Sequence, residues 1–219
     1  MKPARPIWPV LLIVLLLAAA SPTLALENLG MVVGVDRTEL SGDAPQDLKY
    51  KPDTGYLIGA VVEFRLTRDV LLSIQPSYLH SKTAITYKDK DAGVTRDSLF
   101  LDVDWLVVPV VARIRANEGV LYATGGLDFA WAFGGGLSGG TVDEPADSFI
   151  RNVDVSAVIG VGLEFPVGGN HIITELRYRQ GLINAAKNEQ DIDGDGLPAR
   201  FRFAGFQLTA GFLFSLGGP

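Results

Sequence analysis

The 219-residue chain contains no cysteine and only two histidines. Disulfide bridges, thiolate metal ligands and a cysteine nucleophile are therefore excluded. Basic residues are also in deficit, because 19 lysines and arginines stand against 25 aspartates and glutamates, for a formal net charge of −6. Binding of nucleic acid needs clustered cations that neutralise phosphates, so no nucleic-acid partner is expected.

Long hydrophobic runs are absent except for one near the N-terminus, at residues 10–20, which follows Lys2 and Arg5. A run of roughly 11 residues is shorter than the about 17 to 25 that a transmembrane helix needs. Small residues follow it at the usual cleavage spacing. Residues 1–25 are therefore predicted to be a secretory signal peptide and residues 26–219 the mature domain, with a membrane anchor as the alternative.

The remaining chain alternates apolar residues with polar or small ones, which is the period-two pattern of β-strands. In VDVSAVIGVGLEF, residues 153–165, every odd-numbered residue is aliphatic or aromatic, and the even-numbered positions hold the acids, the serine and both glycines. Most such segments reach about 10 residues, and a tilted strand needs about 9 to 11 to cross a bilayer. Strands are predicted at residues 30–40, 56–66, 70–80, 99–115, 120–133, 153–165, 171–180 and 201–214.

The predicted connections alternate strictly between short and long. Short ones lie near residues 68, 116–119 and 166–170, and long ones span residues 41–54, 81–98, 134–151 and 182–200. Outer-membrane barrels combine tight periplasmic turns with long external loops in this way. The predicted fold class is therefore all-β, an eight-stranded antiparallel up-and-down transmembrane β-barrel in the outer membrane of a Gram-negative cell.

The apolar face of the strands distinguishes a membrane barrel from a soluble lipocalin-like periplasmic binding barrel, which is the alternative. One face is a continuous aliphatic and aromatic surface that suits lipid. The other carries glycines and charges, which are expected to pair in a narrow, packed polar interior, and ion conduction is the weaker alternative. The predicted lumen charge cluster comprises Glu63, Arg65, Arg113, Asp128, Glu164, Glu175, Arg177 and Arg179.

One predicted strand, at residues 99–115, does not follow a simple alternation. Asp102 and Asp104 share a face with Leu106, so acids and aliphatic residues would point the same way. Either the strand enters the membrane only after the aspartates and leaves them in an external loop, or a β-bulge shifts the register. Pro109 in the same strand favours the bulge.

Several blocks of the chain resemble the PorT-like outer-membrane β-barrel domain family. They are LLSIQPSYLHS, WLVVPVVARI, LYATGGLDFAWAF, ITELRYRQGLIN and the closing FQLTAGFLF, in family order over nearly the whole mature chain. Glu175, Arg177, Tyr178 and Gly181 match an acidic–Arg–Tyr–Gly block, whereas Arg113 stands where the family often has lysine. The resemblance implies a barrel of OmpA/OmpX-type architecture, inserted by the barrel-assembly machinery and surrounded by outer-membrane lipid and lipopolysaccharide. It implies no particular activity, since fold does not imply function.

A catalytic role is the main alternative to a structural one, because small outer-membrane barrels include lipid A-modifying enzymes that use histidine and serine. His80 lies near the predicted external rim, and His171 at the opposite, periplasmic end. Adjacent residues in a strand point to opposite faces, so His80 and Ser81 cannot face one another. The protein is therefore predicted to be non-enzymatic.

The long loops are rich in acidic residues. Binding usually resides in polar loops on a rigid scaffold. A structural or surface-interaction role is therefore expected, with surface polysaccharide or lipopolysaccharide bridged by divalent cations as a partner. The loop acids are Asp43, Asp47, Asp53, Asp89, Asp91, Asp143, Glu144, Asp147, Asp191, Asp193 and Asp195.

The stretch DIDGDG resembles the start of a calcium-binding loop. Asp191, Asp193 and Asp195 fall at the first three ligand positions of such a loop. Arg202 occupies the position of the bidentate glutamate, and Pro198 interrupts the segment. The sequence thus predicts at most a weak calcium site and no other cofactor.

Overall fold

The computed structural model describes residues 25–42, 48–88, 95–116, 120–139, 142–148, 150–187 and 201–216. Almost all of the predicted signal peptide lies outside this part of the chain, so that assignment stays a prediction. Among the residues described, no helix is long and apolar enough to cross a membrane. The elements are β1 (Ala25–Gly42), β2 (Leu48–Arg65), β3 (Val70–Ile74), β4 (Ser77–Lys88), β5 (Thr95–Arg115), β6 (Leu121–Gly139), β7 (Val142–Pro145), the 3-10 turn η1 (Ala146–Ser148), β8 (Val153–Val167), β9 (Asn170–Gly181) and β10 (Phe201–Ser215).

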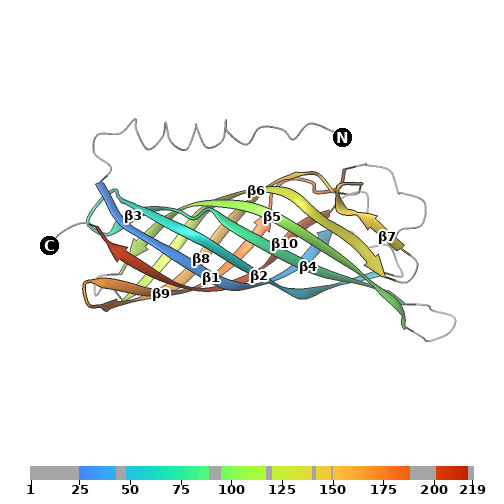
Figure 1. The fold of residues 1–219 in the computed structure, drawn as a ribbon, viewed down its shortest axis with the longest axis horizontal. Coiled ribbons are helices and arrows are strands. Elements are labelled where there is room, and N and C mark those ends of the chain that lie inside the picture. Colours follow the sequence, from blue (N-terminus) through green and yellow to red (C-terminus); the bar gives the residue numbers. More distant parts are fainter. Residues whose placement is uncertain are drawn as a thin grey trace.

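The strands close into one antiparallel barrel, which Figure 1 shows from the side. β10 pairs with β1 from Asn28 opposite Ser215 to Gly42 opposite Phe201, and this pairing closes the ring. β3 and β4 together occupy one place in the ring, because both pair with β2 on one side and with β5 on the other. The short β7 pairs only with the end of β6. The predicted eight-stranded up-and-down barrel is therefore confirmed.

The two ends of the barrel differ in their connections. At the turn end, β2 is joined to β3 by residues 66–69, β5 to β6 by residues 116–120, and β8 to β9 by residues 168–169. Gly168 and Gly169 have φ angles of 58° and 83°, and glycine adopts such positive values without strain, so two residues suffice for this hairpin. β1 begins and β10 ends at the same end, whereas β7 lies at the opposite loop end (Figure 1).

Three of the predicted long loops are mostly strand. β1 and β2 leave only residues 43–47 between them, and β4 and β5 leave only residues 89–94. β6 continues to Gly139, and β7 lies within the third predicted loop. The prediction of loops at residues 41–54, 81–98 and 134–151 was therefore wrong in extent. The segment KTAITY, residues 82–87 near the end of β4, contains three β-branched residues and one aromatic residue, a composition that favours a strand and that the loop prediction did not take into account.

An apolar belt surrounds the outer wall of the barrel. Its residues alternate with buried ones along each strand, as the period of two requires. A soluble barrel would present polar groups here, so the belt indicates contact with lipid. Its exposed members include Leu29, Met31, Val33, Val35, Tyr56, Ile58, Leu127, Phe129, Ile159, Val161, Leu163, Phe165, Ile172, Leu176, Phe206, Leu208 and Phe214.

β5 keeps a strict alternation through its aspartates. Leu101 and Trp105 are buried inside the barrel, while Asp102 and Asp104 face outward. A register shift does occur beside Asp104, but the extra residue is Phe133 of β6, so the faces of β5 are unchanged. The aspartates therefore lie in a strand on the loop-end side of the belt, which neither sequence-based alternative described.

Candidate functional site

The barrel interior is divided into two layers. The half near the turn end contains most of the buried charged side chains, beside the aliphatic Val61, Ile173 and Leu213, and the half near the loop end contains mainly buried aliphatic and aromatic ones. The expectation of a packed polar interior therefore describes only the first layer. We call the two parts the polar layer and the apolar layer.

Arg113 on β5 is the centre of the polar layer. Its guanidinium donates to Glu63 at 2.7 Å and to Glu164 at 2.8 Å, and its carbon lies 3.7 Å from the centre of the Tyr122 ring. Arg115 donates to the other oxygen of Glu164 at 2.9 Å. A buried charge needs this degree of pairing, because an isolated one is strongly destabilising in a dry interior.

A second group of polar contacts surrounds Glu175 on β9. This carboxylate accepts a hydrogen bond from Arg177, one from Thr124 at 2.8 Å and one from Tyr122 at 3.1 Å. Arg177 in turn donates to Gln75 at 2.7 Å, across the barrel. Gln75 lies in the gap between β3 and β4, so the network extends across the interior to the interrupted wall.

Arg179, Asp128 and Asp154 are buried nearer the loop end of the polar layer. Arg179 donates to Thr38 at 3.2 Å, and Ser156 donates to Asp154 at 2.9 Å. Within the described residues, one oxygen of each aspartate and the Nε of Arg179 have no hydrogen-bond partner. Buried polar groups left in this way are where proteins hold internal water.

Arg65 lies outside the cluster that its sequence position predicted. Its side chain is 49 % exposed at the turn-end rim and pairs with Glu27 of β1. Arg65 lies outside the interior because it is the last residue of β2, where the barrel wall ends. The other seven predicted members, Glu63, Arg113, Asp128, Glu164, Glu175, Arg177 and Arg179, are buried inside.

A cavity of about 20 Å³ separates the two layers, large enough for one water molecule. Arg177, Gln75 and Gln207 line its polar side, and Leu79 and Val107 line its apolar side. A volume of this size cannot accommodate a hydrated ion or an organic ligand.

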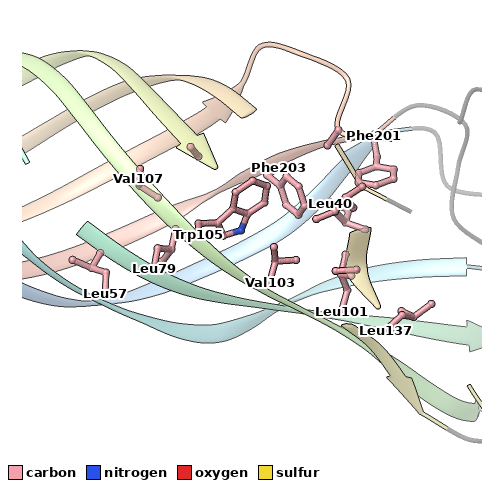
Figure 2. Packing of buried hydrophobic residues seen from close by; sticks show 14 of the residues in the cluster. Leu40, Leu57, Leu79, Leu101, Val103, Trp105, Val107, Leu137, Phe201 and Phe203 are labelled. Carbon is pink, nitrogen blue, oxygen red and sulfur yellow. The ribbon is translucent and has the colours of Figure 1, made fainter. Parts of the chain in front are cut away.

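The apolar layer is organised around Trp105, as Figure 2 shows. The Trp105 ring meets Phe203 edge-on with centroids 5.4 Å apart, and Phe203 meets Phe201 in the same way at 6.0 Å. The indole nitrogen donates to Ser81 at 3.1 Å, so the one polar atom of Trp105 is satisfied inside the barrel. Leu40, Leu57, Leu79, Leu101, Val103 and Val107 pack around these rings.

Two segments from the loop end cover the apolar layer. Ile150 forms a bridge with Ala186, and the main chain of Arg151 donates to the Ala185 carbonyl at 2.8 Å. Ile150, Ala185 and Ala186 are buried in the same cluster as Trp105. The loop-end mouth of the described barrel is thus covered by apolar side chains.

The two histidines lie at opposite ends of the barrel. Ser81 points inward to Trp105, while His80 points outward and contacts Asp104, so His80 and Ser81 form no pair. His171 lies at the turn end, with its Nδ1 3.0 Å from Glu164. The expectation that His80 and Ser81 face opposite ways is confirmed, although Asp104 was not foreseen as a partner of His80.

The predicted calcium ligands Asp191, Asp193 and Asp195 lie outside the described residues. Within the described part of the chain, no group of three or more acidic or histidine side chains is arranged to hold a metal ion. Calcium binding by residues 191–195 therefore stays a prediction.

Sequence reasoning missed several polar members of the interior. Asp36, Thr38, Gln75 and Gln207 take part in its hydrogen bonds, and Asn28 donates to Glu63 at 2.8 Å. The period of two could have indicated some of them, since Asp36 and Thr38 alternate with the exposed Val35 and Arg37 on β1, and Gln207 lies between the exposed Phe206 and Leu208 on β10. The predicted cluster contained charged residues only, so the uncharged polar residues were not considered, and Asp36 was left out although it is charged.

Comparison with known proteins supports the fold. The chain matches the family described as outer membrane protein beta-barrel domain over residues 27–187. No curated protein matches it. The narrower PorT-like assignment stays a prediction.

Solved structures resemble this chain at low identity. Outer membrane protein OprG from Pseudomonas aeruginosa is 10% identical, with 88% of this chain and 95% of that chain covered and a TM-score of 0.50. Ail, the attachment invasion locus protein of Yersinia pestis, solved with the heparin analogue sucrose octasulfate, is 16% identical, with 86% and 99% covered and a TM-score of 0.42. At these identities the likeness concerns the fold alone.

The closed ring and the apolar outer wall exclude the soluble lipocalin-like alternative, because such a barrel presents a polar face to water. The family match spans most of the chain and agrees with that geometry. This is an outer-membrane protein that belongs to the outer membrane protein beta-barrel domain family.

Proposed function

We propose that this protein is a non-enzymatic, non-conducting envelope barrel that acts through its external end. The observation that carries the proposal is the double closure of the interior, by the network around Arg113 and by the packing around Trp105. Water and ions would have to displace both layers. Outer-membrane barrels place short turns in the periplasm and long loops outside, so the loop end is the external end.

The external end offers a rigid support for surface contacts. β4, β5 and β6 continue past the apolar belt at this end and pair with one another there. The acidic residues of the connecting segments, including Asp191, Asp193 and Asp195, supply ligands for divalent cations. We infer that the partner is an anionic surface polysaccharide bound through such cations. Contacts with lipopolysaccharide and the barrel-assembly machinery are expected of the family.

Planar-bilayer recording tests the closure. The purified, folded protein is expected to show no large stable conductance at neutral pH, because neither layer contains a continuous path for ions. Heat-modifiable migration in gel electrophoresis verifies that the recorded sample is folded. A large, stable conductance from the folded protein would overturn the non-conducting role.

A triple variant tests the external role. Changing Asp191, Asp193 and Asp195 to Asn removes the charges but keeps the chain length, and calcium-dependent binding of an anionic polysaccharide to cells is expected to fall. Asp69→Asn is the control, since Asp69 is an exposed acid at the turn end, on the periplasmic side. Equal binding by the triple variant and the wild type would contradict the role of this loop.

A further inference from the structure

A polar cluster with aromatic members lies on the outer wall of the described barrel, at the external border of the apolar belt. Tyr56 of β2, His80 of β4 and Asp104 of β5 are direct cross-strand neighbours. All three side chains point away from the interior. Tyr78, two residues before His80 on the same face, completes the cluster. A carboxylate and an imidazole would be costly in the hydrocarbon region, so their presence on the outer wall marks the border with the headgroups.

Hydrogen bonds fix the cluster on one side and leave it open on the other. Asp104 Oδ1 accepts from the Tyr78 hydroxyl at 2.6 Å and lies 2.7 Å from His80 Nδ1. Within the described residues, Asp104 Oδ2 and His80 Nε2 take part in no hydrogen bond. The carboxylate thus orients the imidazole while one acceptor and one ring nitrogen remain available for a ligand.

Aromatic rings flank these open atoms. The Tyr56 ring lies 5.2 Å from the His80 ring and 5.9 Å from the Tyr78 ring, and Tyr78 lies 6.0 Å from Phe133. Phe133 is the bulge residue of β6 and is 65 % exposed. The bulge therefore brings a fourth ring to a surface that three other strands already share.

Gly134 keeps the open side of the carboxylate clear. A Cβ atom at this position would lie 2.9 Å from Asp104 Oδ2, closer than side-chain atoms normally pack. Any larger residue opposite Asp104 would therefore push against the oxygen that has no partner. The absence of a side chain at position 134 keeps that oxygen accessible.

The position of the cluster along the barrel axis determines which part of the membrane it contacts. Leu106, the outward residue that follows Asp104 toward the turn end, belongs to the apolar wall, so the cluster lies where acyl chains give way to headgroups. The lipid headgroup on the external side of a Gram-negative outer membrane is a glucosamine disaccharide. On the opposite wall, Phe206 of β10 is an outward aromatic residue whose cross-strand neighbours are Arg37 of β1 and Tyr178 of β9, so no carboxylate stands directly beside it.

We propose that Tyr56, Tyr78, His80, Asp104 and Phe133 form a binding site for the sugar headgroup of an outer-leaflet glycolipid. The rings provide apolar, amphipathic faces for the C–H side of a pyranose. Asp104 Oδ2 accepts from a sugar hydroxyl and His80 Nε2 exchanges a hydrogen bond with a second one. A carboxylate repels phosphate, so the sugar and not the phosphate is the recognised group. The site lies on the barrel wall and does not rest on the proposed role of the external loops.

Binding of lipid A to the folded protein in detergent micelles tests the site, in buffer that contains EDTA so that no cation-bridged loop contact contributes. Native mass spectrometry counts bound lipid and gives the relative affinity. Asp104→Asn and Tyr56→Leu are each expected to weaken lipid A binding about tenfold, because each removes a principal contact. Phe206→Leu, a change of an outward aromatic on the opposite wall, is the matched control and is expected to bind as the wild type does.

Two further lipids identify the recognised group. Dephosphorylated lipid A is expected to bind as well as lipid A does, and phosphatidylglycerol, which has phosphate but no sugar, is expected not to compete. Unchanged binding by Asp104→Asn, equal loss in Phe206→Leu, or loss of binding on dephosphorylation would each overturn the proposal. The first two outcomes indicate general annular lipid, and the third indicates phosphate recognition.

Discussion

The polar and apolar layers close the same barrel by different physical means. In the polar layer, Arg113 is held by directional contacts to two carboxylates, so each member depends on specific partners. In the apolar layer, Trp105 and its neighbours are held by close packing, which depends on volume. Loss of one partner should therefore leave an unpaired charge in the first layer but only a cavity in the second.

The largest effect is expected for Arg113→Ala. The change leaves Glu63 buried without a cation and Glu164 with Arg115 alone, and breaking a buried ion pair in this way costs about 5 kcal/mol of unfolding free energy. The loss of unfolding free energy is measured by urea unfolding in lipid vesicles, monitored by tryptophan fluorescence. A loss below about 1 kcal/mol would show that the network is replaceable, as a surface pair is.

Trp105→Ala should have the next largest effect, about 4 kcal/mol, because removal of a buried indole leaves a cavity beside Phe203. Urea unfolding in lipid vesicles also measures this loss of unfolding free energy. Here it is monitored by gel migration, because the variant lacks one of the tryptophan fluorophores. Phe100→Ala is the control on the same strand, since Phe100 faces outward and is half-exposed. Equal losses in both variants would mean that the apolar layer contributes no packing of its own.

Gly162→Ala tests how tightly the polar layer is packed. A Cβ atom there would lie 2.2 Å from the Tyr122 ring, which covers Arg113, so a loss of about 2 kcal/mol is expected from overpacking. At Gly125 a Cβ atom would meet only one backbone oxygen, at 3.9 Å, and Gly125→Ala should be nearly neutral. Midpoints of thermal unfolding for the two variants give the comparison; similar midpoints would contradict it.

The smallest effect is expected for Arg65→Met. Its ion pair with Glu27 is half-exposed at the rim, and such pairs contribute about 1 kcal/mol or less. The effect should shrink further in high salt, which screens exposed charges but not the Arg113 network. Urea unfolding at low and high ionic strength measures this, and a salt-independent loss as large as that of Arg113→Ala would remove the distinction between rim and interior.

Much of the fold could be predicted from local patterns. The alternation in residues 153–165 identified β8 and its two faces, and the short connection at Gly168 and Gly169 identified the hairpin. Strand ends were harder to place, because β4 and β5 continue past the belt, where both faces contain polar residues and the alternation weakens. The pairing of His80 with Asp104 could not be predicted, since it depends on the register between β4 and β5.

The sequence by itself determined the number of strands in the ring, which face meets lipid, and the acidic, cysteine-free character of the chain. These properties follow from local alternation and composition, which the period of a strand converts directly into faces. Only the tertiary structure decided which residues meet across the barrel: that Arg113 lies between Glu63 and Glu164, that Trp105 meets Phe203, and that Asp104 meets His80. Those contacts join strands far apart in the chain, and ring closure and register, which no local pattern contains, bring them together.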